Sequence, residues 1–254
     1  GGKLSMNTVK VRNIEIGSGV PKICVPIVGV TKDEIIAEAK TFDSIPVDVV
    51  EWRVDWFEDV FDTDKVLDVA KDLQTILKDT PILFTFRTAK EGGEKAISSE
   101  DYKALNMAVA KSGYVDLIDV EAFTGEEIVK SMIREAHSYG VKVVYHSCGS
   151  IVEAIPLLIE AGVDVIHPIQ ALAAGMDPAN LKDKFDGKIS FCGGVDTQDL
   201  LPNGTPEQVA AKVKELRTYF PTGLIVSPSH EGLQPDVPPS NIKALFDEAT
   251  KIYE

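Results

Sequence analysis

The chain has 254 residues, of which 44% are hydrophobic and 26% charged, and its formal net charge is −14. This composition is ordinary for a globular protein, and the length is the usual one for a single (β/α)8 barrel. The negative charge argues against nucleic acid or an anionic membrane as a partner, because phosphates would be repelled. No apolar run approaches the roughly 20 residues that a membrane-spanning helix needs.

Residues 1–5 read GGKLS before Met6, and we interpret them as a cloning remnant, which indicates recombinant expression. The three cysteines are odd in number and lie in strand-like runs, so a disulfide framework is not expected and a reducing, cytoplasmic location is favoured. Cys24 and Cys192 are interpreted as small core residues inside their strands.

A strand followed by an amphipathic helix recurs along the chain after a short alternating segment, 9–16, which predicts a strand that is half of a hairpin. The eight predicted strands of this repeat are 22–29, 47–55, 81–88, 115–121, 141–149, 162–169, 188–196 and 223–230. Start signals precede several helices, namely Thr31 with Glu34, Asp177 with Pro178, Thr205 with Gln208, and Pro239 with Ser240.

Strict alternation of strands and helices predicts parallel strands joined by right-handed crossovers. Eight such units can close into a barrel or form an open doubly wound sheet. Polar residues at the C-terminal ends of nearly all the strands favour the barrel, and no glycine-rich nucleotide fingerprint follows the first strand. We therefore predict an α/β fold, a single (β/α)8 TIM barrel with a short N-terminal extra strand or hairpin.

The stretch VKVVYHSCGS, from 141 to 150, contains the fifth predicted strand and carries two residues that can bind metal or transfer protons. Residues two apart share a face of a strand, so His146 and Cys148 are expected to point the same way. Ser150 followed by Glu153 predicts a capping box that opens the next helix.

Charged side chains gather at the predicted ends of strands two, three and four. They are Glu51, Arg53, Asp55, Arg87, Asp119 and Glu121. Arginines that are held by carboxylates can clamp a carboxylate-bearing ligand through bidentate hydrogen bonds, which predicts a small-anion site. The alternative is that these charges pair with one another and only fill the mouth of the barrel.

Four segments before residue 143, EWRVD, LFTFRT, KEGGE and DLIDVE, resemble type I 3-dehydroquinate dehydratase. The resemblance implies that Glu51, Arg53, Arg87 and Glu91 bind the substrate or orient a catalytic histidine. It also implies a Schiff-base lysine on the sixth strand and a histidine on the fifth. Cys148 stands where that histidine belongs and the sixth strand has no lysine, so dehydratase activity is expected to be lost.

The segments HSCGS, LIEAGVDVIHPIQ and SPSHEGLQPDVPPSNI, after residue 142, resemble the uroporphyrinogen decarboxylase superfamily. This superfamily includes corrinoid-dependent methyltransferases and has a (β/α)8 barrel. The resemblance implies a zinc motif at His146 and Cys148, with His230 in the place of a third ligand. Loss of the metal geometry is the alternative, so no cofactor is expected, although zinc is possible.

Two further residues of this half have weaker assignments. Asp196 resembles a position at the mouth of the barrel, without a role that the sequence can assign. His167, which precedes Pro168, is interpreted as a packed or capping residue rather than a ligand.

These observations predict one structural domain in three segments: 1–8 as the terminus, 9–142 as a dehydroquinase-like half-barrel and 143–254 as a decarboxylase-like half-barrel. The first hypothesis for function is an engineered hybrid scaffold without the activity of either family. The second is a binding protein that holds a small anion or zinc. The third is residual dehydratase-like lyase or decarboxylase activity. A monomer or homodimer is expected.

Overall fold

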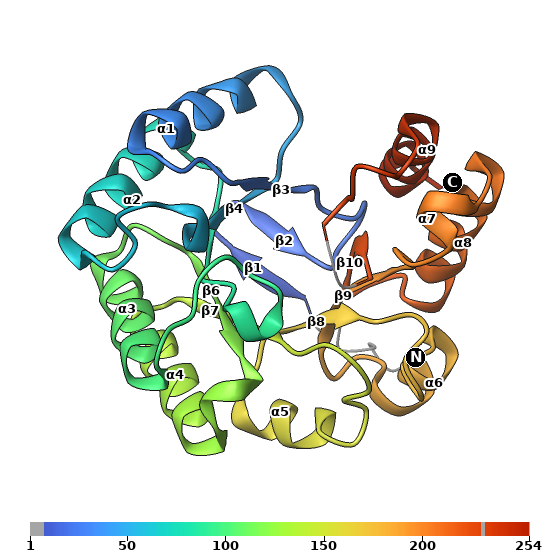
Figure 1. Ribbon diagram of the computed structural model, residues 1–254. Helices are drawn as coiled ribbons and strands as arrows, with labels where there is room; N and C mark the ends of the chain where they lie inside the picture. Colours follow the sequence, from blue (N-terminus) through green and yellow to red (C-terminus); the bar gives the residue numbers. More distant parts are fainter. Residues whose placement is uncertain (1–7, 230–231, 254) are drawn as a thin grey trace.

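The computed structural model describes residues 8–229 and 232–253. An eight-stranded parallel sheet curls around the centre and helices surround it (Figure 1), so the predicted (β/α)8 TIM barrel is confirmed. The strands are β3 (Cys24–Ile27), β4 (Val49–Arg53), β5 (Ile82–Thr85), β6 (Leu117–Glu121), β7 (Lys142–His146), β8 (Val165–Ile169), β9 (Ser190–Val195) and β10 (Leu224–Pro228).

Helices follow the strands and cover the outside of the sheet (Figure 1). They are α1 (Lys32–Thr41), α2 (Thr63–Leu77), α3 (Ser99–Ser112), α4 (Glu126–Ser138), α5 (Ile155–Ala161), α6 (Pro178–Phe185), α7 (Leu200–Asn203), α8 (Pro206–Tyr219) and α9 (Pro239–Thr250). None of the helices in the described part of the chain is long and apolar enough to cross a membrane.

Four of the five start signals of the helices are confirmed and one is wrong. Pro239 and Ser240 lie in the first turn of α9, which begins at Pro239. Thr31 and Thr205 form capping boxes, and Asp177 caps α6 by accepting from Asn180 N. Ser150 does not cap a helix, because α5 begins five residues later with Pro156 in its first turn. The Ser150 hydroxyl instead donates to the carbonyl of Ala174.

The strands pair in sequence order from β3 to β10, and the pairing of β6 with β7 runs over five residues. Within the described residues, no hydrogen-bonded pairing joins β3 to β10, so the sheet curls without the continuous ladder that full closure predicts. Pro26 in β3 and Pro228 in β10 lack an N–H donor, which is typical of strands at an edge.

The prediction that Cys24 and Cys192 are core residues is wrong for Cys24 and agrees with the packing of Cys192. Cys24 is exposed, and it belongs to β3, which pairs with β4 alone among the strands of the described residues. Cys192 is half-buried against the apolar cluster inside the barrel.

The N-terminal hairpin closes the end of the barrel where the strands begin. Its strands β1 (Val9–Val11) and β2 (Ile14–Ile16) pack on the first inward-facing side chains of the barrel strands. These side chains form one apolar cluster with the hairpin, made of Val9, Val11, Ile16, Val49, Leu117, Val144 and Val165. Arg12 anchors the hairpin turn, because its Nε donates to Asp116 Oδ1 at 2.7 Å.

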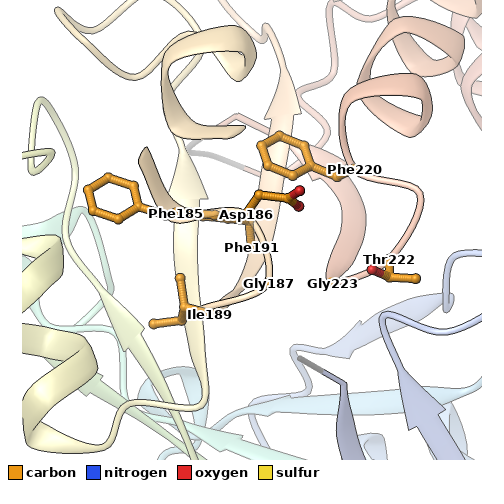
Figure 2. A pocket seen from close by; sticks show the side chains of 8 residues that line it. All are labelled: Phe185, Asp186, Gly187, Ile189, Phe191, Phe220, Thr222 and Gly223. Carbon is orange, nitrogen blue, oxygen red and sulfur yellow. The ribbon is translucent and has the colours of Figure 1, made fainter. Parts of the chain in front are cut away.

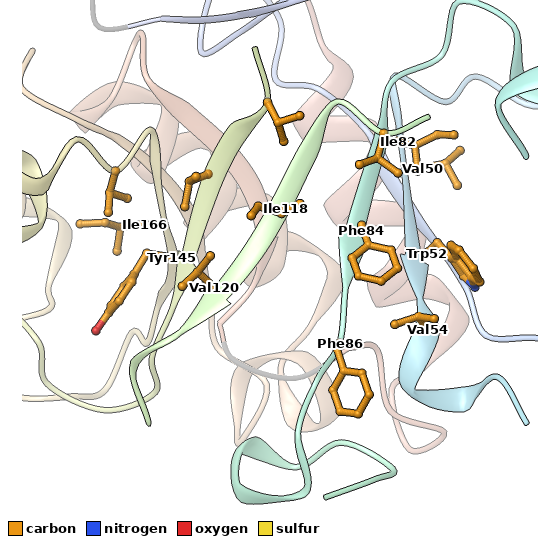
Figure 3. Close-up of a cluster of buried hydrophobic side chains, with 14 of the residues drawn as sticks. Val50, Trp52, Val54, Ile82, Phe84, Phe86, Ile118, Val120, Tyr145 and Ile166 are labelled. Carbon is orange, nitrogen blue, oxygen red and sulfur yellow. The ribbon is translucent and has the colours of Figure 1, made fainter. Parts of the chain in front are cut away.

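Alternating side chains of the strands face outward and pack beneath the helices. Figure 3 shows this layer, in which Trp52 meets Phe84 edge to face with ring centroids 5.6 Å apart. Such near-continuous apolar strands are expected where a parallel sheet is covered by helices. The residues between them face inward, and on β4 to β8 they are polar beyond the apolar cluster at the hairpin end.

Candidate active site

The polar inward-facing side chains lie near the C-terminal ends of the strands, where TIM barrels carry their active sites. The two-residue period places them above the apolar cluster, because each follows an inward-facing apolar residue by two positions. They are Glu51 on β4, Thr85 on β5, Asp119 on β6, His146 on β7 and His167 on β8. Thr85 is fully buried, and its Oγ1 has no hydrogen-bond partner among the described residues.

Arg87 is buried between two carboxylates of β6. Its Nη1 and Nη2 donate to the two oxygens of Asp119 at 2.9 and 3.0 Å, and Nη1 also donates to Glu121 at 2.6 Å. Burial by itself lowers the pKa of Arg87, but the charges of Asp119 and Glu121 outweigh it and raise the pKa above its ordinary value. Thr88 completes this network by donating from N and Oγ1 to Glu121.

Burial raises the pKa of Asp119 to about 7, although the charge of Arg87 acts in the opposite direction. The same cause, followed by the nearby charge of Glu121, raises the pKa of Glu91. Each of these carboxyl groups therefore takes up a proton at higher pH than an ordinary carboxyl does.

Arg53 and Asp55 form a second pair at the rim. Arg53 donates from Nε and Nη2 to the two oxygens of Asp55 at 2.9 and 2.8 Å. Asp55 also accepts from the backbone N–H groups of Arg87 and Glu94, so its position is fixed. A guanidinium carries five donors, and Arg53 can therefore still donate from Nη1 to a ligand.

His146 lies next to predicted site residues from both halves of the chain. Its Nε2 lies 3.7 Å from Cys148 Sγ and 3.9 Å from Glu91 Oε2, which comes from the 3₁₀ turn Ala89–Glu91 after β5. Its Nδ1 lies 2.9 Å from Nδ1 of His167. Glu91 is predicted from the first half of the chain and Cys148 from the second, and the structure brings both to one imidazole nitrogen.

Both histidines resist protonation. Burial, followed by the charge of Arg87, lowers the pKa of His146 well below 6.5 and that of His167 to about 3. Neutral imidazole is the form that acts as a general base or a metal ligand.

His167 packs against His146, a contact that was not predicted from the sequence, and the prediction that it is not a ligand stays untested. The sequence contains a signal that could have found it. The inward-facing period of β8, which includes Val165, places His167 on the same side two positions later.

Zinc fits the group made by Glu91, His146 and Cys148. Zinc–sulfur and zinc–nitrogen bonds of about 2.3 and 2.05 Å at a tetrahedral angle separate the two ligand atoms by about 3.5 Å. The observed separation of Cys148 Sγ and His146 Nε2 is 3.7 Å. A second candidate group, Asp119 with His146 and His167, also has its ligand atoms within 4.8 Å of one another. The predicted third ligand, His230, lies outside the described residues.

The described contacts of the Asp196 carboxylate are with the backbone of its own turn and not with Glu91, His146 or Cys148. Its oxygens accept from the backbone N–H groups of Gln198, Asp199 and Leu200, ahead of the short helix α7. This arrangement is that of a side chain that caps a turn.

Small cavities lie at the opposite end of the barrel. One of about 10 Å³, shown in Figure 2, lies where β9 and β10 begin, between Phe185, Phe191 and Phe220. Another, of about 120 Å³, is lined by Arg217 and Tyr253 among others. Both are remote from the histidines, so the candidate active site remains the mouth at the strand ends.

Comparison with protein families supports both resemblances. The model of the type I 3-dehydroquinase family matches residues 23–150, which is half of the chain. The model of the uroporphyrinogen decarboxylase family matches residues 104–252, which is more than half. The chain belongs to both families. The two matches overlap over residues 104–150, which run from within α3 to four residues beyond the end of β7.

Individual relatives agree with the match to the type I 3-dehydroquinase family. The chain is 52% identical over 136 residues to a 3-dehydroquinate dehydratase of Clostridium botulinum, and 54% identical over 139 residues to one of Listeria monocytogenes. These matches cover 54% and 55% of the chain and the same shares of the relatives, so the chain spans about half the length of the curated relatives it matches.

Solved structures of 3-dehydroquinate dehydratases resemble the whole barrel. The type I 3-dehydroquinate dehydratase of Clostridium difficile with covalently modified comenic acid has a TM-score of 0.72 and 30% identity. The alignment covers 95% of this chain and 96% of that one.

These comparisons contradict the hypothesis of an engineered scaffold without activity. The half of the chain that carries Glu51, Arg53, Arg87 and Glu91 is more than half identical to relatives that are named as enzymes, at 52% and 54%. The findings favour the lyase alternative instead.

Proposed function

We propose that the mouth of the barrel is the active site of a lyase that dehydrates a hydroxylated ring carboxylate of the 3-dehydroquinate type. The observation that carries this proposal is the neutral His146, whose Nε2 faces Glu91 and Cys148 at the strand ends. The names of the relatives support the choice of substrate class.

The side chains suit the steps of such an elimination. Arg53 binds the substrate carboxylate through Nη1, and His146 Nε2 removes a proton from the carbon next to the carbonyl. Glu91, whose pKa is raised, gives its proton to the departing hydroxyl group, which leaves as water. The proton on His146 then returns to Glu91, so both groups regain their starting forms.

The proposal uses no imine. Strand β8, from Val165 to Ile169, contains no lysine, so a Schiff base from that strand is not available. Carbanion stabilisation then depends on the guanidinium group of Arg53, because that of Arg87 is paired with Asp119 and Glu121.

The test is turnover of 3-dehydroquinate, followed by the ultraviolet absorption of the conjugated enone that dehydration produces. His146→Gln should lower kcat by about 100- to 10,000-fold, the usual contribution of a general base. His137→Gln, an exposed change on α4, is the matched control and should leave turnover unchanged. Borohydride should trap no adduct. Absence of turnover in the unmodified chain would contradict the proposal.

Zinc binding is a second candidate function, and the group made by Glu91, His146 and Cys148 supports it. A bound zinc ion supplies a Lewis acid at the mouth of the barrel. The thiol, the imidazole and the carboxylate are all ligand types that zinc accepts, and three protein ligands leave one position open.

Cobalt titration tests the zinc proposal, because a cobalt–thiolate bond gives a charge-transfer absorption. Cys148→Ser should abolish that absorption, whereas Cys24→Ser, a change at the exposed cysteine of β3, should retain it. A spectrum without a thiolate band in the unmodified chain would contradict the proposal.

We also infer that the barrel joins a dehydroquinase-like segment, 9–142, to a decarboxylase-like segment, 143–254. The two family matches, which meet over residues 104–150, support this division. The boundary falls inside β7, the strand that carries His146.

A further inference from the structure

The imidazoles of His146 and His167 contact each other through their Nδ1 atoms. The two Nδ1 atoms are 2.9 Å apart, and the rings are tilted by 45° with centroids 4.9 Å apart. A neutral imidazole carries one N–H and one lone pair. Two neutral rings in this contact share one proton between their δ nitrogens, so they must be different tautomers.

The functions proposed for the mouth decide which ring carries that proton, and the present inference rests on them. A base and a zinc ligand both need a lone pair on His146 Nε2, and the tautomer that has it bears its proton on Nδ1. We propose that His167 is a positioning residue, whose Nδ1 accepts this proton in a hydrogen bond and so leaves Nε2 of His146 as the electron-pair donor at the mouth.

The backbone holds the two rings in register. His146 and His167 are direct partners in the pairing of β7 with β8, and Ser147 N donates to His167 O at 3.1 Å. Asp119 is the other acceptor near the pair, but both of its oxygens already accept from Arg87. His167 is therefore the partner that the geometry offers to Nδ1 of His146.

Metal-binding and catalytic histidines commonly have a hydrogen-bond partner on the ring nitrogen that does not face the metal or substrate. The partner of the second ring nitrogen fixes both the tautomer and the ring orientation, and its loss typically lowers metal affinity about 10- to 100-fold. The contact of the two rings limits them to two arrangements of the shared proton, and the functions proposed for the mouth select the one with the proton on His146 Nδ1.

The direct test is the tautomer of His146 in the full-length, 15N-labelled chain after treatment with a chelator. Long-range 1H–15N correlation spectra distinguish protonated from unprotonated ring nitrogens, and His146→Gln assigns the signals. The expected result is a protonated Nδ1 and an unprotonated Nε2. A protonated Nε2 on His146 would overturn the inference.

Two substitutions separate positioning from packing. His167→Leu fills the space without an acceptor, so His146 should shift toward the Nε2-protonated tautomer and zinc affinity should fall about 10- to 100-fold. His167→Asn keeps an amide oxygen as acceptor and should retain the tautomer and most of the affinity. An unchanged tautomer in His167→Leu would contradict the role.

These measurements keep the two proposals distinguishable. If the unmodified chain neither binds zinc nor turns over substrate, the proposed function fails, and the tautomer of His146 still supports or overturns the role of His167. If His167→Leu does not fold, the unmodified chain and His167→Asn decide the question by the same spectra.

Discussion

At the scale of single residues, Arg87 is the cation that pairs with the buried carboxylates at the mouth of the barrel. Its guanidinium neutralises Asp119 and Glu121, which are 1% and 0% exposed. A buried ion pair of this kind adds little to stability relative to an apolar replacement of the whole network, but removing one partner leaves charges buried without compensation.

Arg87→Met should therefore lower the free energy of unfolding by about 3–5 kcal/mol, measured by urea denaturation. Lys130→Met is the matched control, because its pair with Glu126 is exposed and contributes less than about 1 kcal/mol. Equal losses in the two variants would show that the network does not stabilise the fold in this way.

His167 gives a pH dependence of stability whose sign follows from its pKa. The pKa in the folded chain, about 3, lies below the ordinary value of 6.5. Below pH 6.5 the unfolded chain therefore takes up a proton that the folded chain does not, and stability falls as the pH decreases from 6.5 toward 3.

In the presence of a chelator, the free energy of unfolding of the unmodified chain should fall relative to that of His167→Asn over this range. The difference should change by at most about 1.4 kcal/mol per pH unit, the value for one proton. Parallel stability curves for the two proteins between pH 6.5 and 3 would contradict the prediction.

At the scale of elements, the same capping-box spacing starts one helix and does not start another. Thr205 and Gln208 satisfy each other's backbone N–H groups at the start of α8, as the sequence predicts. Ser150 and Glu153 have the same spacing, but Pro156 lies in the first turn of α5 and the helix begins only at Ile155.

Thr205→Ala should cost about 1 kcal/mol of stability, because the N–H of Gln208 loses its acceptor. Ser150→Ala removes an exposed hydrogen bond to Ala174 and no cap, so its effect should stay within about 0.5 kcal/mol. Thermal denaturation of the two variants measures the difference, and a larger loss in Ser150→Ala would reverse the assignment.

At the scale of the whole molecule, we expect the barrel to fold as one cooperative unit, although its sequence matches two families. The large outer core includes residues from both segments, such as Trp52 and Phe191, and β6 pairs with β7 across the division. A half-barrel would expose β6 or β7 as a long apolar edge.

Residues 1–140 and 141–254, expressed separately, should therefore lack the fixed tertiary structure of the intact chain. Near-ultraviolet circular dichroism of each piece, with the intact chain as reference, measures this. A native-like spectrum from either piece alone would show that the two segments are independent domains.

The sequence by itself determined the elements and the fold class of this protein. The two-residue period of the strands and the 3–4 spacing of the helices depend only on local geometry, so the eight strands, the hairpin and the rim positions of Glu51, Arg87 and Asp119 could be predicted. Capping boxes at Thr31 and Thr205 are local for the same reason.

Only the tertiary structure decided which side chains meet. Three features depend on strands that are far apart in sequence. They are the contact of Glu91 with His146, the pairing of His146 with His167 and, within the part of the chain that the structure describes, the absence of a ladder between β3 and β10. A periodic pattern assigns a side chain to a face, but the distance between two faces depends on how the sheet curls and on the register of neighbouring strands. These quantities arise from packing the whole barrel.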